Sequence, residues 1–364
     1  MTSLKKILIA YSSNHPIIAN LSEAFVKRGV NVEYVLADRN TWFDRWIIRP
    51  LNKQLHNFRL LPKNRVFFSN HPLTHKNYRS AALVEKIYSF DPDLLLIVRG
   101  IAFNHDALAH AKRLFGWWVE KEERTAEALR ELKLFDWYFF LAESSVEQAK
   151  ASGFHNVSYQ SHVVNPCRFY EIAGGKKKYD ICFVGNWSLH RQKYIDAALK
   201  VTPNVAIFGR KWRRNNIGNS KVLRSVKGRW IEGESLNRLY NESRIVLNVT
   251  NWGVGVGKER SGMNMRVFEV PASGAFLLTD ESREMADHLT PGVHVGIFDE
   301  SDLPGFETIL RHYLDCSEER EAIARAGCNH VRQKYTYDDA VDKFISVYDE
   351  LTSLGADKAT QVSS

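Results

Sequence analysis

Residues 261–280 read SGMNMRVFEVPASGAFLLTD, a run of small and apolar residues that contains one arginine and one glutamate. Its first four residues are typical of a loop that ends at a helix cap, with Asn264 as the expected cap. Gly274 is typical of a helix end, and the AFLLTD that follows is typical of a buried strand. Ionisable side chains in such surroundings are normally paired or face a functional site. The stretch therefore predicts a loop, a short helix and a strand that carry Arg266 and Glu269 toward a crevice. A surface pair between these two residues is the alternative.

Short apolar runs bounded by turn residues recur along the whole chain and alternate with longer segments of helical periodicity. This alternation is typical of parallel sheets built from strand, helix and strand units. The expected strands form two series, at 6–12, 31–37, 93–100, 137–143 and 156–163, and then at 179–186, 204–210, 244–250, 275–280 and 293–299. We therefore predict an α/β fold with two Rossmann-like, doubly wound domains that face a central cleft.

The length of 364 residues suits two domains, and the boundary is expected near residue 175. There, EIAGGKKKYD has the composition of a linker, a glycine pair followed by three lysines. The prediction assigns 1–174 to an N-terminal domain and 175–335 to a C-terminal domain. A C-terminal helix is expected over 336–352, and the tail 353–364 is expected to be disordered.

Charge and composition limit the partners and the setting. The net charge of +8 favours anionic partners, which include nucleotide phosphates, anionic lipids, acidic glycans and nucleic acid, although solubility alone also explains it. The four cysteines are widely spaced and form no C-x-x-C pair, so neither a zinc site nor a disulfide framework is indicated, and a reducing cytoplasm fits best. No window approaches the roughly 20 apolar residues of a membrane span, so any membrane contact is expected to be peripheral.

Two further loops follow expected strands of the second series. Gly185 ends one strand and is followed by a helix that carries Arg191, while Gly209, Arg210 and Lys211 follow the next strand. A glycine at this place lets the backbone approach an anion, and the carboxyl ends of parallel strands face the ligand crevice. These loops therefore predict a phosphate-binding wall; a plain turn and a solvated charge run are the alternatives.

Three stretches carry a resemblance to a known family: RIVLNVTN at 244–251, MNMRVFEVPASGAFLLTD at 263–280 and EEREAIARAGCNHVRQKYTYDDAVDKF at 318–344. Over about 179–350 the chain resembles CgeB-like (spore-maturation type) glycosyltransferases, a branch of the group 1 assemblage with the GT-B fold. The resemblance implies a GT-B architecture in which the C-terminal domain binds a nucleotide-sugar. It also implies that the acceptor enters over the N-terminal domain and that the last helix crosses back to that domain.

The resemblance also implies roles for single residues. Arg266 would meet the diphosphate, Glu269 the ribose, and Gly185 and Arg191 the phosphate side. The wider group often carries a second glutamate eight positions before the one at Glu269. At that position this sequence has Ser261.

The first half supplies three candidates for a catalytic base, His15, His105 and Glu120, each of which follows an apolar run. A histidine or carboxylate opposite the donor would serve as the base of an inverting enzyme, whereas a retaining enzyme could rely mostly on stabilisation of the leaving group. An ordinary loop position is the alternative for each, and the sequence leaves the stereochemical outcome open.

Residues 41–68 stand apart because they mix aromatic and basic side chains and contain a single acid, Asp44. This mixture suits a peripheral membrane contact or an acceptor-binding surface. Packing of the aromatic residues on the N-terminal domain is the alternative.

The sequence therefore predicts a nucleotide-sugar-dependent glycosyltransferase of class EC 2.4 that uses a UDP-, GDP- or dTDP-sugar and needs no cofactor or metal. Arginines and a helix N-terminus would hold the leaving group. The expected acceptor is a glycan or lipid-linked glycan in polysaccharide biosynthesis, in the cytoplasm or at the inner face of the membrane. The alternatives are a nucleotide-sugar epimerase or a phosphorylase of the same fold, and a non-catalytic basic protein that binds glycan or nucleic acid. Nucleic acid is disfavoured because no nucleic-acid-binding signature occurs.

Overall fold

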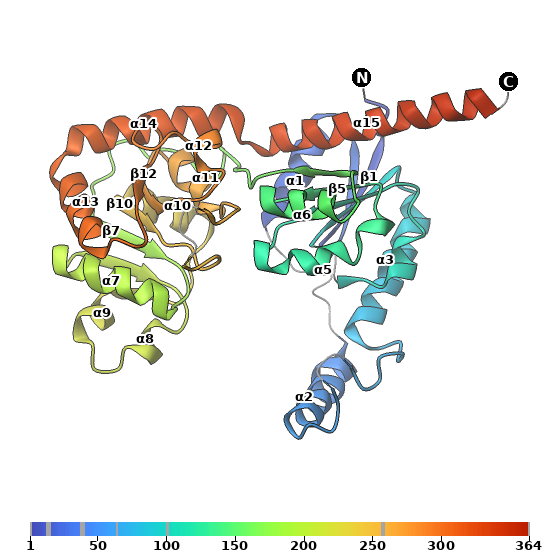
Figure 1. Cartoon of the computed structure of the whole chain (residues 1–364), viewed down its shortest axis with the longest axis horizontal. Coiled ribbons are helices and arrows are strands. Elements are labelled where there is room, and N and C mark those ends of the chain that lie inside the picture. Colours follow the sequence, from blue (N-terminus) through green and yellow to red (C-terminus); the bar gives the residue numbers. More distant parts are fainter. Residues whose placement is uncertain are drawn as a thin grey trace.

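The computed structural model describes residues 2–11, 16–36, 41–62, 65–99, 102–255 and 259–362, with side chains as far as Leu354. Its strands form two parallel six-stranded sheets, one in each half of the chain (Figure 1). Helices pack against both sheets, so the prediction of an α/β fold with two Rossmann-like domains is confirmed.

The N-terminal sheet has the order β2-β1-β3-β4-β5-β6, and all its neighbouring strands are parallel. Its inner strands are buried on both faces and therefore read as continuous apolar runs, as in LLLIV of β3. The strands are β1 (Lys6–Tyr11), β2 (Asn31–Leu36), β3 (Leu94–Val98), β4 (Leu114–Trp118), β5 (Trp137–Phe140) and β6 (Val157–Tyr159). Its helices are α1 (Pro16–Lys27), α2 (Arg49–Asn57), α3 (His75–Phe90), α4 (His105–Leu108), α5 (Thr125–Leu129) and α6 (Glu143–Ala151).

The C-terminal sheet has the order β12-β11-β10-β7-β8-β9, again with parallel neighbours. The chain order reverses between β7 and β10, and in open α/β sheets ligands bind beyond the strand ends at such a point. The strands are β7 (Tyr179–Val184), β8 (Val205–Phe208), β9 (Val226–Gly228), β10 (Ser243–Asn248), β11 (Leu277–Asp280) and β12 (Gly296–Phe298). The helices are α7 (Leu189–Val201), α8 (Trp212–Asn215), α9 (Ser220–Ser225), α10 (Gly233–Asn241), α11 (Arg266–Ala272), α12 (Met285–His288), α13 (Leu303–Asp315), α14 (Ser317–Lys334) and α15 (Tyr337–Val362).

Helix α15 leaves the C-terminal domain and lies along the N-terminal one (Figure 1). Its buried face, which includes Val341 and Phe344, belongs to the same apolar core as β1 and α1. Arg28, just after α1, pairs with Asp338 and Asp342 of α15. Apolar burial and ion pairs thus fix the last helix to the first domain.

The structure differs from the sequence prediction at three places. Strands β4 and β9 were not among the expected strands, and helix α15 runs to Val362 through most of the tail that was expected to be disordered. The expected boundary at residue 175 lies in the connection between β6 and β7 and stays a prediction. Among the residues described, no helix combines the length and the apolar character that crossing a membrane requires.

Candidate functional site

A cleft of about 500 Å³ lies between the two domains, within the size range of small-molecule sites. The C-terminal domain lines it with the ends of β7 and β8, the loop between β9 and α10, and α11. The other wall comes from α1, the connection 163–169 and the start of α15. Of the predicted donor residues, the cleft brings together Gly185, Gly209, Arg266 and Glu269.

The loop before α11 positions Arg266. The Oδ1 atom of Asn264 accepts a hydrogen bond from the backbone N–H of Arg266 at 3.0 Å, and its amide nitrogen donates to the side-chain oxygen of Asn248 at 3.1 Å. The next two N–H groups donate to the carbonyl oxygens of Asn264 and Met265. These amides of α11 are therefore satisfied within the loop. These contacts do not support an anion at the helix N-terminus, which stays a prediction, and the guanidinium of Arg266 lines the cleft.

Arg266 and Glu269 are the charged pair that α11 brings to the cleft, which Arg168, Arg229 and Glu232 also line. Among the described residues, the Nε atom of Arg266 is buried without a hydrogen-bond partner. Burial raises the pKa of Glu269 to about 7, although the charge of Arg266 opposes this shift. The Tyr240 hydroxyl lies in the same wall, and burial together with Glu269 raises its pKa. Neither charged group is saturated by the protein, so the pair can still take up polar groups of a ligand.

Two glycines allow the turns after β7 and β8 to touch. Gly209 donates its N–H to the Gly228 carbonyl at 3.0 Å, and a Cβ atom at Gly209 would lie 1.9 Å from the carbonyl oxygen of Gly185. A Cβ atom at Gly185 would lie 2.9 Å from the ring of Phe183 and 3.1 Å from the Arg191 guanidinium. Both positions therefore need glycine for steric reasons.

Arg191 lies behind this wall and not among the residues that line the cleft. Its Nε donates to the Val249 carbonyl at 2.8 Å, one terminal nitrogen donates to the Asn186 carbonyl at 3.0 Å, and the guanidinium lies over the ring of Phe183. Burial, assisted by the charge of Arg266, lowers the pKa of Arg191 to about 10. The position does not support the predicted phosphate contact, and Arg191 instead ties the turn after β7 to the end of β10.

Two other predicted donor residues also lie outside the cleft lining. Arg210 is exposed and stacks on Trp230 at 5.4 Å, and Lys211 is an exposed residue in the left-handed region before α8.

The loop between β9 and α10 was missed by sequence reasoning. Trp230 lines the cleft yet is 63% exposed, which is unusual for a tryptophan and suits stacking on a planar ligand. The neighbouring Arg229 and Glu232 also line the cleft. The GRWIEGE sequence offers only a weak signal, an exposed aromatic residue between two glycines, and β9 is too short to point to it.

The two candidate bases among the described residues, His105 and Glu120, are not brought together at the cleft. His15 lies outside the described residues. Glu120 pairs with Arg99 and Arg124, and His105 is nearly half exposed with its Nε2 atom 4.0 Å from Glu131. Neither Glu120 nor His105 lines the cleft.

Glu284 joins the two domains beside the loop that carries Ser261. This carboxylate is fully buried and accepts hydrogen bonds from the backbone N–H groups of Glu143 and Gly262, at 3.0 and 2.8 Å, and from the hydroxyl of Ser261. The N–H of Ser144 donates to the same hydroxyl at 3.2 Å. Where the wider group often has a glutamate, this chain thus has a serine engaged in the domain interface.

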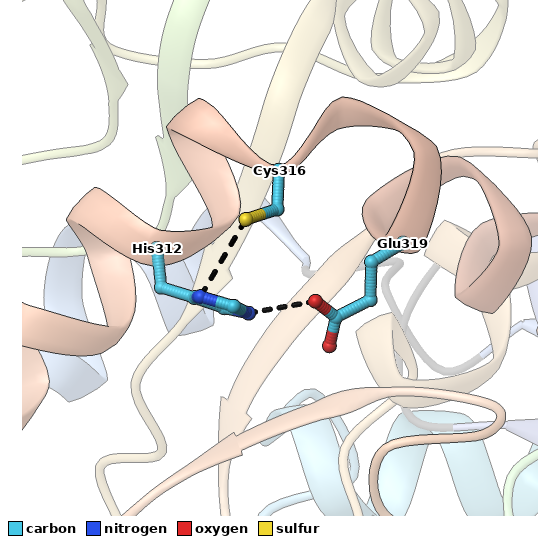
Figure 2. Close-up of side chains that lie close together, drawn as sticks. All are labelled: His312, Cys316 and Glu319. Atoms are coloured by element: carbon cyan, nitrogen blue, oxygen red, sulfur yellow. Dashed lines mark hydrogen bonds and ion pairs between the residues drawn. The ribbon is translucent and has the colours of Figure 1, made fainter.

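Among the described residues, one group of side chains lies close enough to hold a metal: His312, Cys316 and Glu319, at the corner between α13 and α14 (Figure 2). The Nε2 atom of His312 lies 2.7 Å from Glu319, and its Nδ1 atom lies 3.6 Å from the Cys316 sulfur. The two partners therefore approach opposite nitrogens of one ring, which a single ion cannot bridge in this arrangement. None of the three lines the cleft.

Comparison with known proteins agrees with this description. The family described as glycosyl transferase-like matches residues 191–346. No curated protein matches the chain. Among solved structures, the chain is similar to sucrose-phosphate synthase from Thermosynechococcus elongatus, with a TM-score of 0.67 and 10% identity over 96% of this chain and 100% of the other. It is also similar to Anabaena HepE in complex with UDP and glucose, with a TM-score of 0.64 and 13% identity over 94% and 99% of the two chains.

A third similar structure is a putative UDP-N-acetylglucosamine 2-epimerase from Listeria monocytogenes, with a TM-score of 0.52 and 13% identity over 94% of this chain and 95% of the other. At these identities the structural similarity establishes the GT-B fold, and the family match over 191–346 supports a glycosyltransferase function.

Proposed function

We propose that this chain is a nucleotide-sugar-dependent glycosyltransferase of the CgeB-like kind and that the cleft between its domains is the donor site. The observation that carries the proposal is the pair formed by Arg266, with its unpartnered buried Nε, and Glu269, with its raised pKa, opposite the wall of Gly185 and Gly209. The family match that covers α11 supports the assignment.

The proposed roles follow from charge and shape. The guanidinium of Arg266 binds the diphosphate and stabilises the negative charge that develops on the leaving group. The carboxylate of Glu269 accepts hydrogen bonds from the ribose hydroxyls, and Trp230 stacks on the base. Gly185 and Gly209 keep the turns after β7 and β8 in contact, and these turns form the wall that the phosphates would meet.

The acceptor is proposed to be a glycan or lipid-linked glycan, reached from the N-terminal domain in the cytoplasmic assembly of a surface polysaccharide. The base is proposed to come from the same domain, with His15, His105 and Glu120 as candidates. Alanine variants of each, assayed for transfer, would assign that role. A retaining reaction would leave turnover dependent on Arg266 alone.

The first test is thermal stabilisation by UDP, GDP, dTDP, ADP and CMP, each with and without Mg²⁺. A ligand that binds only the folded chain at 100 times its dissociation constant adds about 2.7 kcal/mol of stability. We expect one nucleotide to raise the melting temperature of the wild type and of the control Arg214→Ala, and the shift to vanish in Arg266→Ala. Arg214 is an exposed arginine of the same domain outside the cleft lining. Equal shifts in all three proteins, or no shift in any, would refute the donor site.

An epimerase reaction is the second candidate because the fold is shared with the Listeria protein described as a putative epimerase. Incubation of the preferred nucleotide-sugar without acceptor separates the two reactions. An epimerase would convert the sugar to an equilibrium mixture of the two epimers, whereas a transferase would leave it intact or release it slowly to water. A non-catalytic glycan-binding protein would give neither product.

A further inference from the structure

The segment between β2 and α3 carries an unusual concentration of exposed apolar side chains. Residues 41–62 and 65–78, here called the α2 surface, hold eleven of the twenty-one exposed large apolar side chains among the described residues. Trp42, Phe58 and Leu60 are 70%, 71% and 72% exposed. Apolar side chains gathered in this way on a soluble domain mark an interaction site. The alternative that the aromatic residues of this segment pack on the N-terminal domain does not hold for Trp42 and Phe58.

All exposed charges of the α2 surface are positive. Its single acid, Asp44, is 1% exposed, and its carboxylate accepts hydrogen bonds from Arg49 Nε at 2.6 Å and from the backbone N–H of His75 at 3.1 Å. Arg45 and Arg59 are exposed beside the aromatic residues. The surface therefore offers cations together with apolar side chains, the combination that binds the interface of an anionic bilayer.

The α2 surface is held in shape by polar contacts. Buried Asn52 donates to the Ile48 and Phe67 carbonyls at 2.8 and 3.2 Å and accepts from the Phe67 N–H at 2.6 Å. The hydroxyl of Thr41 donates to the Leu73 carbonyl at 2.6 Å. These bonds tie the loop after α2 to the helix, so the exposed side chains stand on a supported platform.

The α2 surface also lies where a partner can meet the acceptor side of the molecule. Helix α2 stands out from the N-terminal domain on the side away from α15 (Figure 1). The segment follows the carboxyl end of β2, and these ends of parallel strands meet at one edge of a sheet. A cavity of about 1040 Å³ lies behind α2 and reaches Asn104, which follows β3, and its lining includes Lys53, His56 and Lys76. The hollow behind the platform is thus basic and leads toward the same sheet edge.

We propose that the α2 surface docks on a bilayer that contains anionic lipid, with Trp42, Phe58 and Leu60 in the interfacial layer and the arginines against the headgroups. The cavity behind α2 receives the phosphorylated headgroup of the lipid that carries the acceptor. This last step rests on the proposed transferase function, whereas docking itself does not. Vesicle binding and nucleotide binding are therefore measured separately, and the failure of one leaves the other standing.

The test is co-sedimentation of the full chain with vesicles of phosphatidylcholine alone or with about 30% phosphatidylglycerol. We expect binding to the anionic vesicles only, and we expect it to weaken between about 0.05 and about 0.5 M salt because exposed charges are screened. No binding to anionic vesicles, or equal binding to both kinds, would overturn the proposal.

Charge variants separate the α2 surface from the net charge of the chain. The first variant reverses three charges of the α2 surface, Arg45→Glu/Arg59→Glu/Arg65→Glu. The second reverses three exposed charges of the C-terminal domain, Lys221→Glu/Arg224→Glu/Lys227→Glu. Both change the net charge equally. Each basic residue near an anionic surface contributes roughly a fivefold factor, so the first variant should bind at least about 100-fold more weakly and the second within about fivefold of wild type. Equal losses in both would show an effect of net charge and overturn the proposal.

Apolar variants test the insertion step. We compare Trp42→Ser/Phe58→Ser/Leu60→Ser with Ile217→Ser/Val293→Ser/Leu354→Ser, which removes exposed apolar side chains elsewhere. Only the variant of the α2 surface should bind vesicles more weakly, by at least about tenfold. The melting temperature of both variants should be unchanged, because the altered side chains are exposed. Unchanged vesicle binding in the first variant would overturn insertion. If the wild type forms a concentration-dependent dimer in light scattering and the first variant does not, the surface binds a second copy of the chain. If the wild type binds duplex DNA tightly instead of vesicles and the first variant does not, the surface binds nucleic acid. Either result would overturn the proposal.

Discussion

Replacement of Glu269 by glutamine should stabilise the protein while it weakens nucleotide binding. The Glu269 carboxyl has an ordinary pKa of 4.5 and a pKa of about 7 in the folded chain, because burial disfavours its charged form. The folded state therefore binds more protons than the unfolded state between these values, and stability falls as the pH rises from 4.5 to about 7. Above that range the penalty is complete, and below 4.5 it is absent.

The size of the penalty follows from the two pKa values. At 1.36 kcal/mol for each pH unit, it is roughly 1.4 kcal/mol at pH 5.5 and at most roughly 3.4 kcal/mol at pH 8.5. Glutamine carries no titrating proton, so the stability advantage of Glu269→Gln over wild type should grow by about 2 kcal/mol across this range. A constant offset from burial of the amide cancels in this difference.

The assay is urea denaturation at pH 5.5, 7 and 8.5, followed by the tryptophan fluorescence of the chain, to which Trp212, buried in the C-terminal domain, contributes. Glu232→Gln is the matched control, since it makes the same chemical change at an exposed carboxylate of the same cleft. The control should follow wild type within about 0.5 kcal/mol at every pH. A stability difference between Glu269→Gln and wild type that does not change with pH, or one that shrinks as the pH rises, would refute the reasoning.

Two substitutions test the cleft, and one labelling experiment tests the core. Gly209→Ala should destabilise the protein by about 2 kcal/mol or more and abolish nucleotide binding, since its Cβ atom would lie 1.9 Å from the Gly185 carbonyl oxygen. The control is Gly175→Ala, whose Cβ atom would have its nearest neighbour at 3.4 Å, and it should be nearly neutral in the same melting and binding assays. Trp230→Ala should weaken nucleotide binding at least about tenfold in calorimetric titration and leave the melting temperature unchanged, because the side chain is 63% exposed. The buried thiol of Cys182, whose pKa burial raises to about 12, should react with a disulfide reagent at pH 8 only after unfolding, so rapid labelling of the native chain at this residue would contradict its burial.

The fold could be predicted from the sequence because the strands of parallel sheets are buried on both faces and their apolar runs are visible without tertiary information. Strand β4 escaped because it contains Gly116, a residue that is unfavourable in strands. The structure explains this glycine, since a Cβ atom there would lie 2.3 Å from the Tyr138 ring on β5. Strand β9 escaped because its three residues are too few to show a pattern. The first miss depends on a neighbour that the sequence does not reveal, and the second depends on the shortness of the strand.

The site was predicted in part for similar reasons. Arg266 and Glu269 stand out because ionisable residues in an apolar run need an explanation. Arg191 looked equivalent, yet its guanidinium donates to the Val249 carbonyl 58 residues away, a contact that no local pattern shows. Trp230 gave only a weak signal because its exposure, and not its type, marks it as unusual.

Buried charges of this chain fall into two kinds, and the difference separates support from function. Asp280 pairs with Arg260 at 3.0 Å and accepts hydrogen bonds from the backbone N–H and the hydroxyl of Thr250, at 3.0 Å each. Glu284 accepts hydrogen bonds from two backbone N–H groups and a hydroxyl. The fold satisfies these groups by itself, so a ligand has nothing to add. Arg266 keeps a buried Nε without a partner, and Glu269 meets its burial by a raised pKa. This lack of partners lowers the stability of the free protein, and only a ligand that supplies the partners removes the penalty. Binding energy is therefore expected at Arg266 and Glu269 and not at the neighbouring buried charges that the protein already satisfies.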